Sequence, residues 1–202
     1  PGTVVQLEGP EVDPTAVAKA RVLGHAAMSD LGVSILLVRR VAEGRYAVVR
    51  ESPRHWRVAG CSVHNSPAVD PLRFSGPAAP LLPAPRGTMS NCGGATTPWG
   101  TFLTCEENFQ DYIDEDITPA GLPHRKRPRR LRAVEGHPGL PRPHEFEGIA
   151  HAADLSLDGR TYGWVGEVDP VAGTLVKHSL LGRFRHENVA VRAEAGRPLV
   201  AY

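Results

Sequence analysis

Short apolar segments separated by polar turns dominate the C-terminal part of the chain. The turn-forming stretches are Asp169–Gly173 and Glu194–Gly196, whose residues favour tight turns. Four strand candidates flank them, at residues 161–168, 174–180, 188–193 and 197–202. Short strands at such close spacing are typical of an antiparallel sheet or a propeller blade.

The N-terminal part predicts one helix. Asp13 can cap its N-terminus, and Pro14 suits the first helical position because its φ angle is already helical. An Ala-rich run continues to Ser29, and Gly32 ends the pattern. We therefore expect a helix from Pro14 to Ser29.

The middle of the chain contains fewer regular patterns. Residues 33–41 and 45–50 are strand candidates, and Ala42-Glu43-Gly44 between them favours a hairpin turn. Arg73–Pro85, rich in Pro and Ala, is expected to be a loop. The chain stops inside its last apolar segment, which would leave a flat hydrophobic edge. We therefore expect residues 1–202 to be a single, incomplete domain of a longer protein.

Residues 111–145 differ in character from the rest of the chain. They begin acidic and become basic at HRKRPRRLR, residues 124–132. The basic run has no interleaved aromatic side chains, which favours a solvated loop over a nucleic-acid-binding patch. We expect this segment to be an exposed excursion.

Composition and net charge exclude several classes of protein and partner. The 21 glycines and 19 prolines are too many for a helical bundle and suit short strands joined by turns. A net charge of +1 gives no reason to expect nucleic acid or an anionic membrane as the main partner. No apolar run is long enough for a transmembrane helix. The first residues, PGTVVQLEGP, lack the basic-then-apolar order of a signal peptide.

The chemistry-bearing residues gather in NCGGATTPWGTFLTCEENF, residues 91–109. Cys92 precedes two glycines, and a strand-like run leads from there to the paired carboxylates Glu106 and Glu107. A loop followed by one strand could return these carboxylates towards the thiol. A soft thiolate beside hard carboxylates suits a transition metal such as iron, with a harder cation nearby.

The same stretch also has a purely structural interpretation. Its glycines and proline can shape a tight loop, and Cys92 can be a small buried hydrophobic residue. With Cys61 and Cys105 the chain has three cysteines and no CxxC pair, so at least one thiol is unpaired. Spacing alone leaves both interpretations open.

Several motifs taken together resemble the PhoX-type alkaline phosphatases. They are NCGGATTPWG at 91–100, TCEEN at 104–108, YGWVGEVDP at 162–170 and LGRFRHE at 181–187. FSGPAAP (74–80) and LGVSILLVRR (31–40) are similar to further segments of that family. The resemblance covers most of residues 25–202 and is interrupted at 111–145.

The resemblance implies an all-β, β-propeller-like fold, here a partial propeller of short antiparallel strands with one N-terminal helix. It implies hydrolysis of phosphomonoesters at a centre of ferric iron and calcium. By position Cys92 would ligate iron, and Glu106 or Glu107, Glu167 and Glu187 would be metal ligands. Adjacent residues of a strand face opposite sides, so we expect only one of the Glu106–Glu107 pair to point inward.

The family resemblance also implies export to the periplasm or beyond. It implies a phosphomonoester substrate and leaves substrate preference and oligomeric state open. Arg183 and Arg185 lie just before Glu187 in the sequence and are candidate phosphate donors, although surface ion pairing explains them as well. The alternative function is a non-catalytic β-propeller module that binds a partner or serves as a scaffold. The presence of Cys92, Glu167 and Glu187 favours the enzyme over that alternative, because a decayed site should lose its costly buried carboxylates early.

Overall fold

The computed structural model describes residues 3–6, 13–113, 130–133, 146–147 and 157–202. Its contacts form two compact units, which are described separately. One unit consists of Pro1–Asp30 and Asn108–Arg160, and the other of Leu31–Glu107 and Thr161–Tyr202. Among the described residues, no helix is long and apolar enough to cross a membrane.

The first unit contains the predicted helix. α1 spans Pro14–Asp30, and Asp13 caps it by accepting a hydrogen bond at Oδ1 from the Thr15 amide, at 2.9 Å. Its buried residues, Ala20, Gly24 and Met28, are spaced by four and share one face. The prediction of one N-terminal helix is confirmed.

The first unit also contains a small antiparallel sheet in the order β1-β10-β11. These strands are Thr3–Gln6, Arg130–Ala133 and Phe146–Glu147, and the 3-10 helix η2 spans Phe109–Asp111. Most of the predicted excursion at 111–145 lies outside the described residues, and its residues 130–133 form β10.

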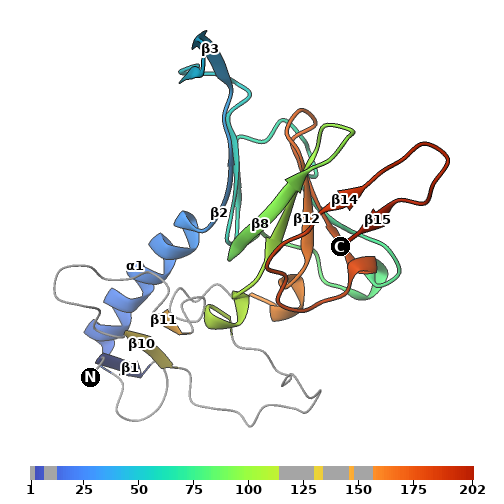
Figure 1. The fold of residues 1–202 in the computed structure, drawn as a ribbon. Coiled ribbons are helices and arrows are strands. Elements are labelled where there is room, and N and C mark those ends of the chain that lie inside the picture. Colours follow the sequence, from blue (N-terminus) through green and yellow to red (C-terminus); the bar gives the residue numbers. More distant parts are fainter. Residues whose placement is uncertain (1–2, 7–12, 114–129, 134–145, 148–156) are drawn as a thin grey trace. The chain divides into compact units, whose positions relative to one another are not determined.

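The second unit contains a five-stranded sheet in the order β7-β13-β12-β9-β8. Figure 1 labels two of its strands, β8 and β12. Neighbouring strands run antiparallel, except that β7 and β13 are parallel. The strand bounds are Leu72–Ser75 for β7, Asn91–Thr96 for β8, Phe102–Glu106 for β9, Val165–Asp169 for β12 and Thr174–His178 for β13.

The turn between β12 and β13 follows the prediction. Asp169 Oδ1 accepts hydrogen bonds from the amides of Val171 and Ala172, and Gly173 adopts a φ of 76°. These are the preferred residues for such a turn, because Asp can bind nearby amides and Gly tolerates positive φ. The two strands therefore form where the hydrophobic pattern placed them.

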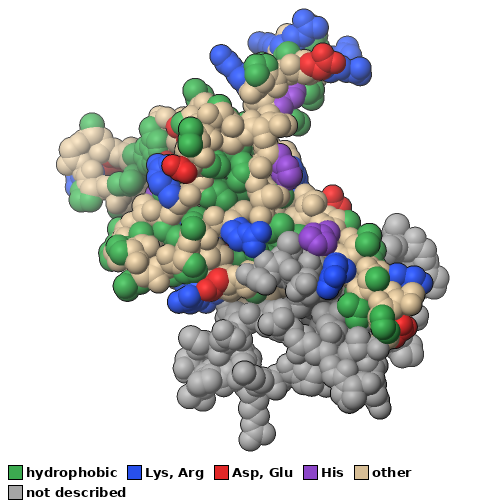
Figure 2. All heavy atoms as spheres, turned by 180° about the vertical axis from the view of Figure 1, so that it is seen from behind, with side chains coloured by type: hydrophobic (Ala, Val, Ile, Leu, Met, Phe, Trp, Pro, Cys, Tyr) green, Lys and Arg blue, Asp and Glu red, His purple; other side chains and the backbone are tan. Residues whose placement is uncertain are grey.

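The remaining strands of the second unit belong to smaller sheets. β2 (Gly32–Ile35), β5 (Trp56–Ala59) and β6 (Val63–His64) form an antiparallel sheet in the order β2-β5-β6. β3 (Val38–Ala42) pairs with β4 (Arg45–Val48) in an exposed hairpin. Figure 2 shows Lys and Arg side chains gathered on this hairpin. The hairpin is confirmed, whereas the single strand predicted at 33–41 is divided into β2 and β3.

Three other local predictions were wrong. Arg73–Pro85 is not entirely loop, because its first residues belong to β7, which pairs with β13 at 103 residues' separation. NCGGAT is a strand rather than a loop and pairs with β9. The last predicted strands do not extend the same sheet: β14 (Val191–Arg192) and β15 (Val200–Ala201) form a separate two-stranded ribbon. The 3-10 helices η1, η4 and η5 span Ala79–Leu81, Gly159–Thr161 and Ser179–Leu181.

Two apolar clusters support the large sheet. One contains Trp56, Val58, Val168 and Leu175, and the other contains Leu103, Cys105, Val165 and Val189. Burial raises the pKa of the Cys105 thiol to about 11, so this cysteine is a protonated core residue. The described residues are thus mostly β-sheet with one α-helix and no closed barrel, and the all-β class is confirmed.

Candidate functional site

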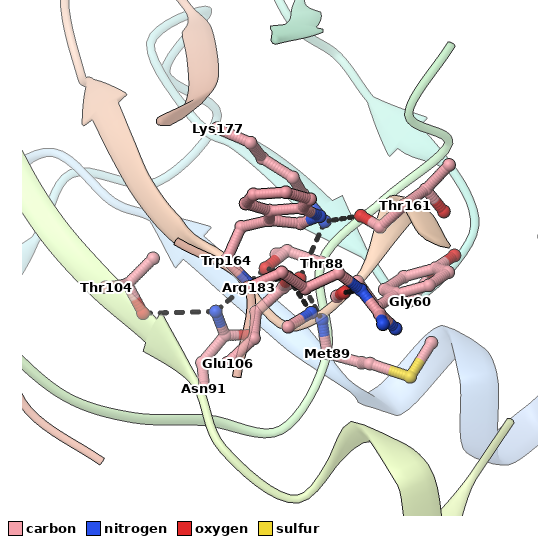
Figure 3. Close-up of polar contacts among 12 residues, drawn as sticks. Gly60, Thr88, Met89, Asn91, Thr104, Glu106, Thr161, Trp164, Lys177 and Arg183 are labelled. Carbon is pink, nitrogen blue, oxygen red and sulfur yellow. Dashed lines mark hydrogen bonds and ion pairs between the residues drawn. The ribbon is translucent and has the colours of Figure 1, made fainter. Parts of the chain in front are cut away.

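Glu106, at the end of β9, lies at the centre of a buried polar cluster (Figure 3). Its side chain is 1% exposed, and the Lys177 ammonium, 0% exposed, donates to Glu106 Oε1 at 2.7 Å. Thr88 Oγ1 and the Met89 amide also donate to Oε1, at 2.8 and 3.2 Å. The amides at 163 and 164 donate to Oε2, at 2.9 and 3.1 Å. We call this group the Glu106–Lys177 centre.

Lys177 enters the centre from β13. Its Nζ also donates to the Thr161 carbonyl at 2.6 Å and lies 4.6 Å from the centroid of the Tyr162 ring. Burial lowers the pKa of the Lys177 ammonium, while the adjacent Glu106 carboxylate acts in the opposite direction. Burial, and then the charge of Glu106, raises the pKa of Tyr162. The ammonium is therefore held by a carboxylate, a carbonyl and an aromatic face.

Cys92 lies on the surface, in an irregular part of β8. The pairing with β9 shifts between Asn91 and Gly94, so Cys92 and Gly93 form a bulge. Partial desolvation raises the pKa of the Cys92 thiol, and a hydrogen bond to Glu107 and the charge of Glu187 raise it further. The structure therefore brings Cys92, Glu107 and Glu187 into one neighbourhood.

Gly93 allows the segment around Glu187 to approach this bulge. The Gly93 amide donates to the Glu187 carbonyl at 2.6 Å. A Cβ atom at position 93 would lie 2.6 Å from Asn188 Oδ1 and 2.8 Å from that carbonyl. Any side chain would push the two segments apart, so the glycine after Cys92 is required for close backbone approach.

Ser90 and Asn91 carry two further signs of a functional site. Ser90 has a φ of 52°, an uncommon conformation for a residue with a side chain. Ser90 Oγ and Asn91 Oδ1 are buried and have no hydrogen-bond partner among the described residues. Buried oxygens rarely stay without a partner, and here they accompany a strained residue that lies two positions before Cys92 in the chain.

Glu167 lies elsewhere on the sheet. Its position on β12 is opposite Leu103, whereas Asn91, next to Cys92, is opposite Glu106 at the end of β9. Trp99 Nε1 and Thr101 Oγ1 donate to Glu167 Oε1, at 2.6 and 2.5 Å. Its carboxylate therefore fastens the turn between β8 and β9 to β12.

His178 completes the surroundings of Glu167. His178 Nε2 lies 2.7 Å from Glu167 Oε2, and His178 Nδ1 lies 2.9 Å from Ser75 Oγ. Burial alone would raise the pKa of Glu167, but the hydrogen bonds from Thr101, Trp99 and His178 lower it overall. This carboxylate is an ionised acceptor whose two oxygens already have protein partners.

The predicted metal ligands thus fall into two groups. Cys92, Glu107 and Glu187 are close together, whereas the carboxylates of Glu106 and Glu167 are engaged by protein donors. Among the residues that the structure describes, no three His, Cys, Asp or Glu side chains are arranged to hold a metal ion.

A pocket of about 430 Å³ opens beside Glu187. Its polar lining includes Arg185, Glu187 and Asn188, and its apolar lining includes Val165, Leu181, Phe184, Val189 and Tyr202.

Of the two predicted phosphate donors, Arg185 lines the pocket, whereas Arg183 Nε donates to the Tyr162 carbonyl at 2.8 Å. Burial lowers the pKa of His186, which also lines the pocket, and this favours a neutral imidazole.

Sequence analysis missed Lys177, Thr88 and His178. Lys177 lies in a strand-like apolar segment, TLVKHSL, and a lysine there was a signal of a buried charge that needs a partner. Thr88 and His178 carry no comparable signal, because their partners are distant in the sequence.

Comparison with known proteins gives two matches. A family model described as alkaline phosphatase PhoX matches residues 7–202. A solved structure of Pseudomonas fluorescens PhoX in complex with vanadate, a transition state analogue, is similar with a TM-score of 0.58 and 31% sequence identity. The match covers 85% of this chain and 30% of that chain, so the chain spans under a third of that protein's length. A search of curated proteins gives no match.

Proposed function

Because the chain belongs to the alkaline phosphatase PhoX family, we propose that it forms part of a metal-dependent enzyme that hydrolyses phosphomonoesters. The observation that carries this proposal is the neighbourhood of Cys92, Glu107 and Glu187. A thiol and two carboxylates lie close together, and the strained residue Ser90 lies two positions before the thiol in the chain. The vanadate bound to the similar protein from Pseudomonas fluorescens is consistent with phosphoryl chemistry.

We assign Cys92, Glu107 and Glu187 as metal ligands, with ferric iron and calcium as the ions. The donor types fit these ions, since a thiolate favours iron over calcium and carboxylates suit both. Ligands from other parts of the protein would complete the coordination, because no three such side chains of the described residues are arranged around one ion. Glu106 and Glu167 are assigned structural roles instead, because protein donors already engage their oxygens. Bound cations would neutralise the charge of a phosphate monoester and hold the attacking oxygen in line.

The chain's own residues contribute positioning and charge. The two carboxylates and the thiolate would hold the cations where β8 lies against the segment around Glu187. Arg185 lines the adjoining pocket and can donate hydrogen bonds to phosphoryl oxygens. The apolar part of the pocket offers space for the alcohol part of the ester and excludes water there.

We further propose that the sheets of this chain are part of a β-propeller, and that the protein acts in the periplasm or outside the cell. Family membership supports both statements.

The second candidate function is a non-catalytic module for binding a partner. It is favoured by one observation, that no three ligating side chains of the described residues form a metal site by themselves.

The test measures metal content and activity in the full natural protein. Hydrolysis of p-nitrophenyl phosphate should require calcium and iron. Glu187→Ala and Cys92→Ala should each lower turnover by at least about 100-fold, because ligands that hold the charge-neutralising cations are lost. Cys92→Ala should in addition remove any iron–thiolate absorption and lower the iron content.

Glu194→Ala provides the matched control, because Glu194 is an exposed carboxylate that pairs with Arg192. This variant should keep both activity and metal content. Wild-type protein that binds neither iron nor calcium, or ligand variants as active as wild type, would contradict the proposal and favour the binding module.

A further inference from the structure

The Glu106–Lys177 centre places a full ion pair where apolar side chains could fill the same space. Both side chains are buried, at 1% and 0% exposure. Taking two charges out of water is costly, and apolar replacements of such pairs are often neutral or stabilising. The pair therefore calls for a role other than net stability.

The hydrogen bonds of the centre reach the segments that carry Cys92 and Glu107. Thr88 and Met89 donate to the Glu106 carboxylate, and Cys92 follows three residues after Met89. Glu107 directly follows Glu106, and its amide donates to the Ser90 carbonyl at 3.0 Å.

The main chain of Glu106 reaches the third proposed ligand. The Glu106 carbonyl accepts a hydrogen bond from the His186 amide at 3.3 Å, and Glu187 is the next residue. The Glu187 carbonyl in turn accepts from the Gly93 amide. The three proposed ligands therefore lie one to three residues from hydrogen bonds that begin or end on Glu106.

The segment at 88–91 depends on this support. Ser90 has a positive φ, and Ser90 Oγ and Asn91 Oδ1 have no partner among the described residues. Asn91 Nδ2 donates to Thr88 Oγ1 at 2.9 Å, and Thr88 in turn donates to Glu106. A strained conformation persists only where its surroundings determine it, and Glu106 supplies much of that constraint.

We propose that the Glu106–Lys177 pair is a positioning device that fixes the relative placement of Cys92, Glu107 and Glu187. Lys177 neutralises and orients the Glu106 carboxylate, and that carboxylate fixes the direction of four further donors. Apolar side chains would fill the volume without fixing these directions, because hydrophobic contact is not directional. The inference rests on the proposed function only in naming the three residues as metal ligands.

The test uses the double variant Glu106→Leu/Lys177→Met in the full natural protein. It leaves no unpaired charge buried, but four other donors lose their acceptor, so its cooperative folding is checked first by circular dichroism. Its iron affinity should fall about 10- to 100-fold, as when residues that orient metal ligands are changed. In metal-stripped protein, the alkylation rate of Cys92, followed by mass spectrometry, should rise at least about threefold because Glu107 no longer contacts the thiol.

Two further variants complete the design. Leu175→Ala, two residues before Lys177 on β13 and fully buried, should lower stability while leaving iron affinity and Cys92 alkylation unchanged. Thr88→Val removes one donor to Glu106 and should change both readouts in the same direction as the double variant, by a smaller factor. Thr88→Val decides the question if the double variant does not fold.

Wild-type values of both readouts in the folded double variant, or in Thr88→Val alone, would overturn the inference. Equal changes in Leu175→Ala would also overturn it, because they would show an effect of general destabilisation. If wild-type protein binds no iron, the proposed function fails, and the alkylation rates alone decide the inference.

Discussion

Glu106 and Glu167 are carboxylates of the same sheet, on the neighbouring strands β9 and β12, yet their environments are opposite. Glu106 is 1% exposed and has five donors, one of them a buried ammonium. The Glu167 side chain is 19% exposed and is held by an indole, a hydroxyl and an imidazole. The amount of burial thus determines how completely a carboxylate must be compensated.

The comparison also shows how little a motif says about a carboxylate's role. Both residues fall in segments that resemble family motifs, and both were candidate metal ligands. In the structure, both have protein partners, while Glu107, the neighbour of Glu106, contacts Cys92. Adjacent positions of one motif therefore serve different purposes.

The largest expected effect comes from breaking the buried pair. Lys177→Met should lower the free energy of unfolding by about 3–5 kcal/mol, because the Glu106 charge is left buried without its cation. Urea denaturation followed by circular dichroism measures this loss. A loss below about 1 kcal/mol would mean that water reaches Glu106 and that the contrast with Glu167 is wrong.

A smaller effect is expected at the second carboxylate. Glu167→Gln should lower the free energy of unfolding by about 1–2 kcal/mol, because the amide weakens charge-assisted hydrogen bonds that are partly open to water. The same denaturation experiment checks it. A cost equal to that of Lys177→Met would show that the two carboxylates are compensated alike.

The smallest expected effect is a loss of folding stability at acid pH, caused by protonation of Glu167. Its pKa is lowered below the ordinary value of 4.5, so the folded protein binds this proton less readily than the unfolded chain. The resulting stability is present above pH 4.5 and is lost as the pH falls through the lower, folded pKa. The stability difference between wild type and Glu167→Gln should therefore shrink in that acid range. A difference that does not change with pH would contradict the lowered pKa.

Local patterns were sufficient for several elements. The Asp13 cap and Pro14 placed the helix, and the Asp169–Gly173 turn placed β12 and β13, because neighbouring residues decide such features. β7 could not be predicted in the same way. Its strand conformation depends on parallel pairing with β13, whose residues are about a hundred positions away.

The candidate site was predictable in composition and only partly in geometry. The motifs indicated Cys92, Glu107 and Glu187, and the structure brings them into one neighbourhood. The alternation of a strand predicted that only one of Glu106 and Glu107 points inward, but it could not say which. Glu106 is the buried one, and the proposed metal ligand is its half-buried neighbour, Glu107.

The sequence by itself determined the family, the all-β class and the residue types of the candidate site, because these depend on local order and composition. Tertiary structure alone decided which protein donors engage Glu106 and Glu167. Lys177 meets Glu106 across 71 residues, and Ser75 meets His178 across 103. The reason is physical: a buried charge must be compensated by whichever groups the folded chain brings to it, and those groups come from distant segments.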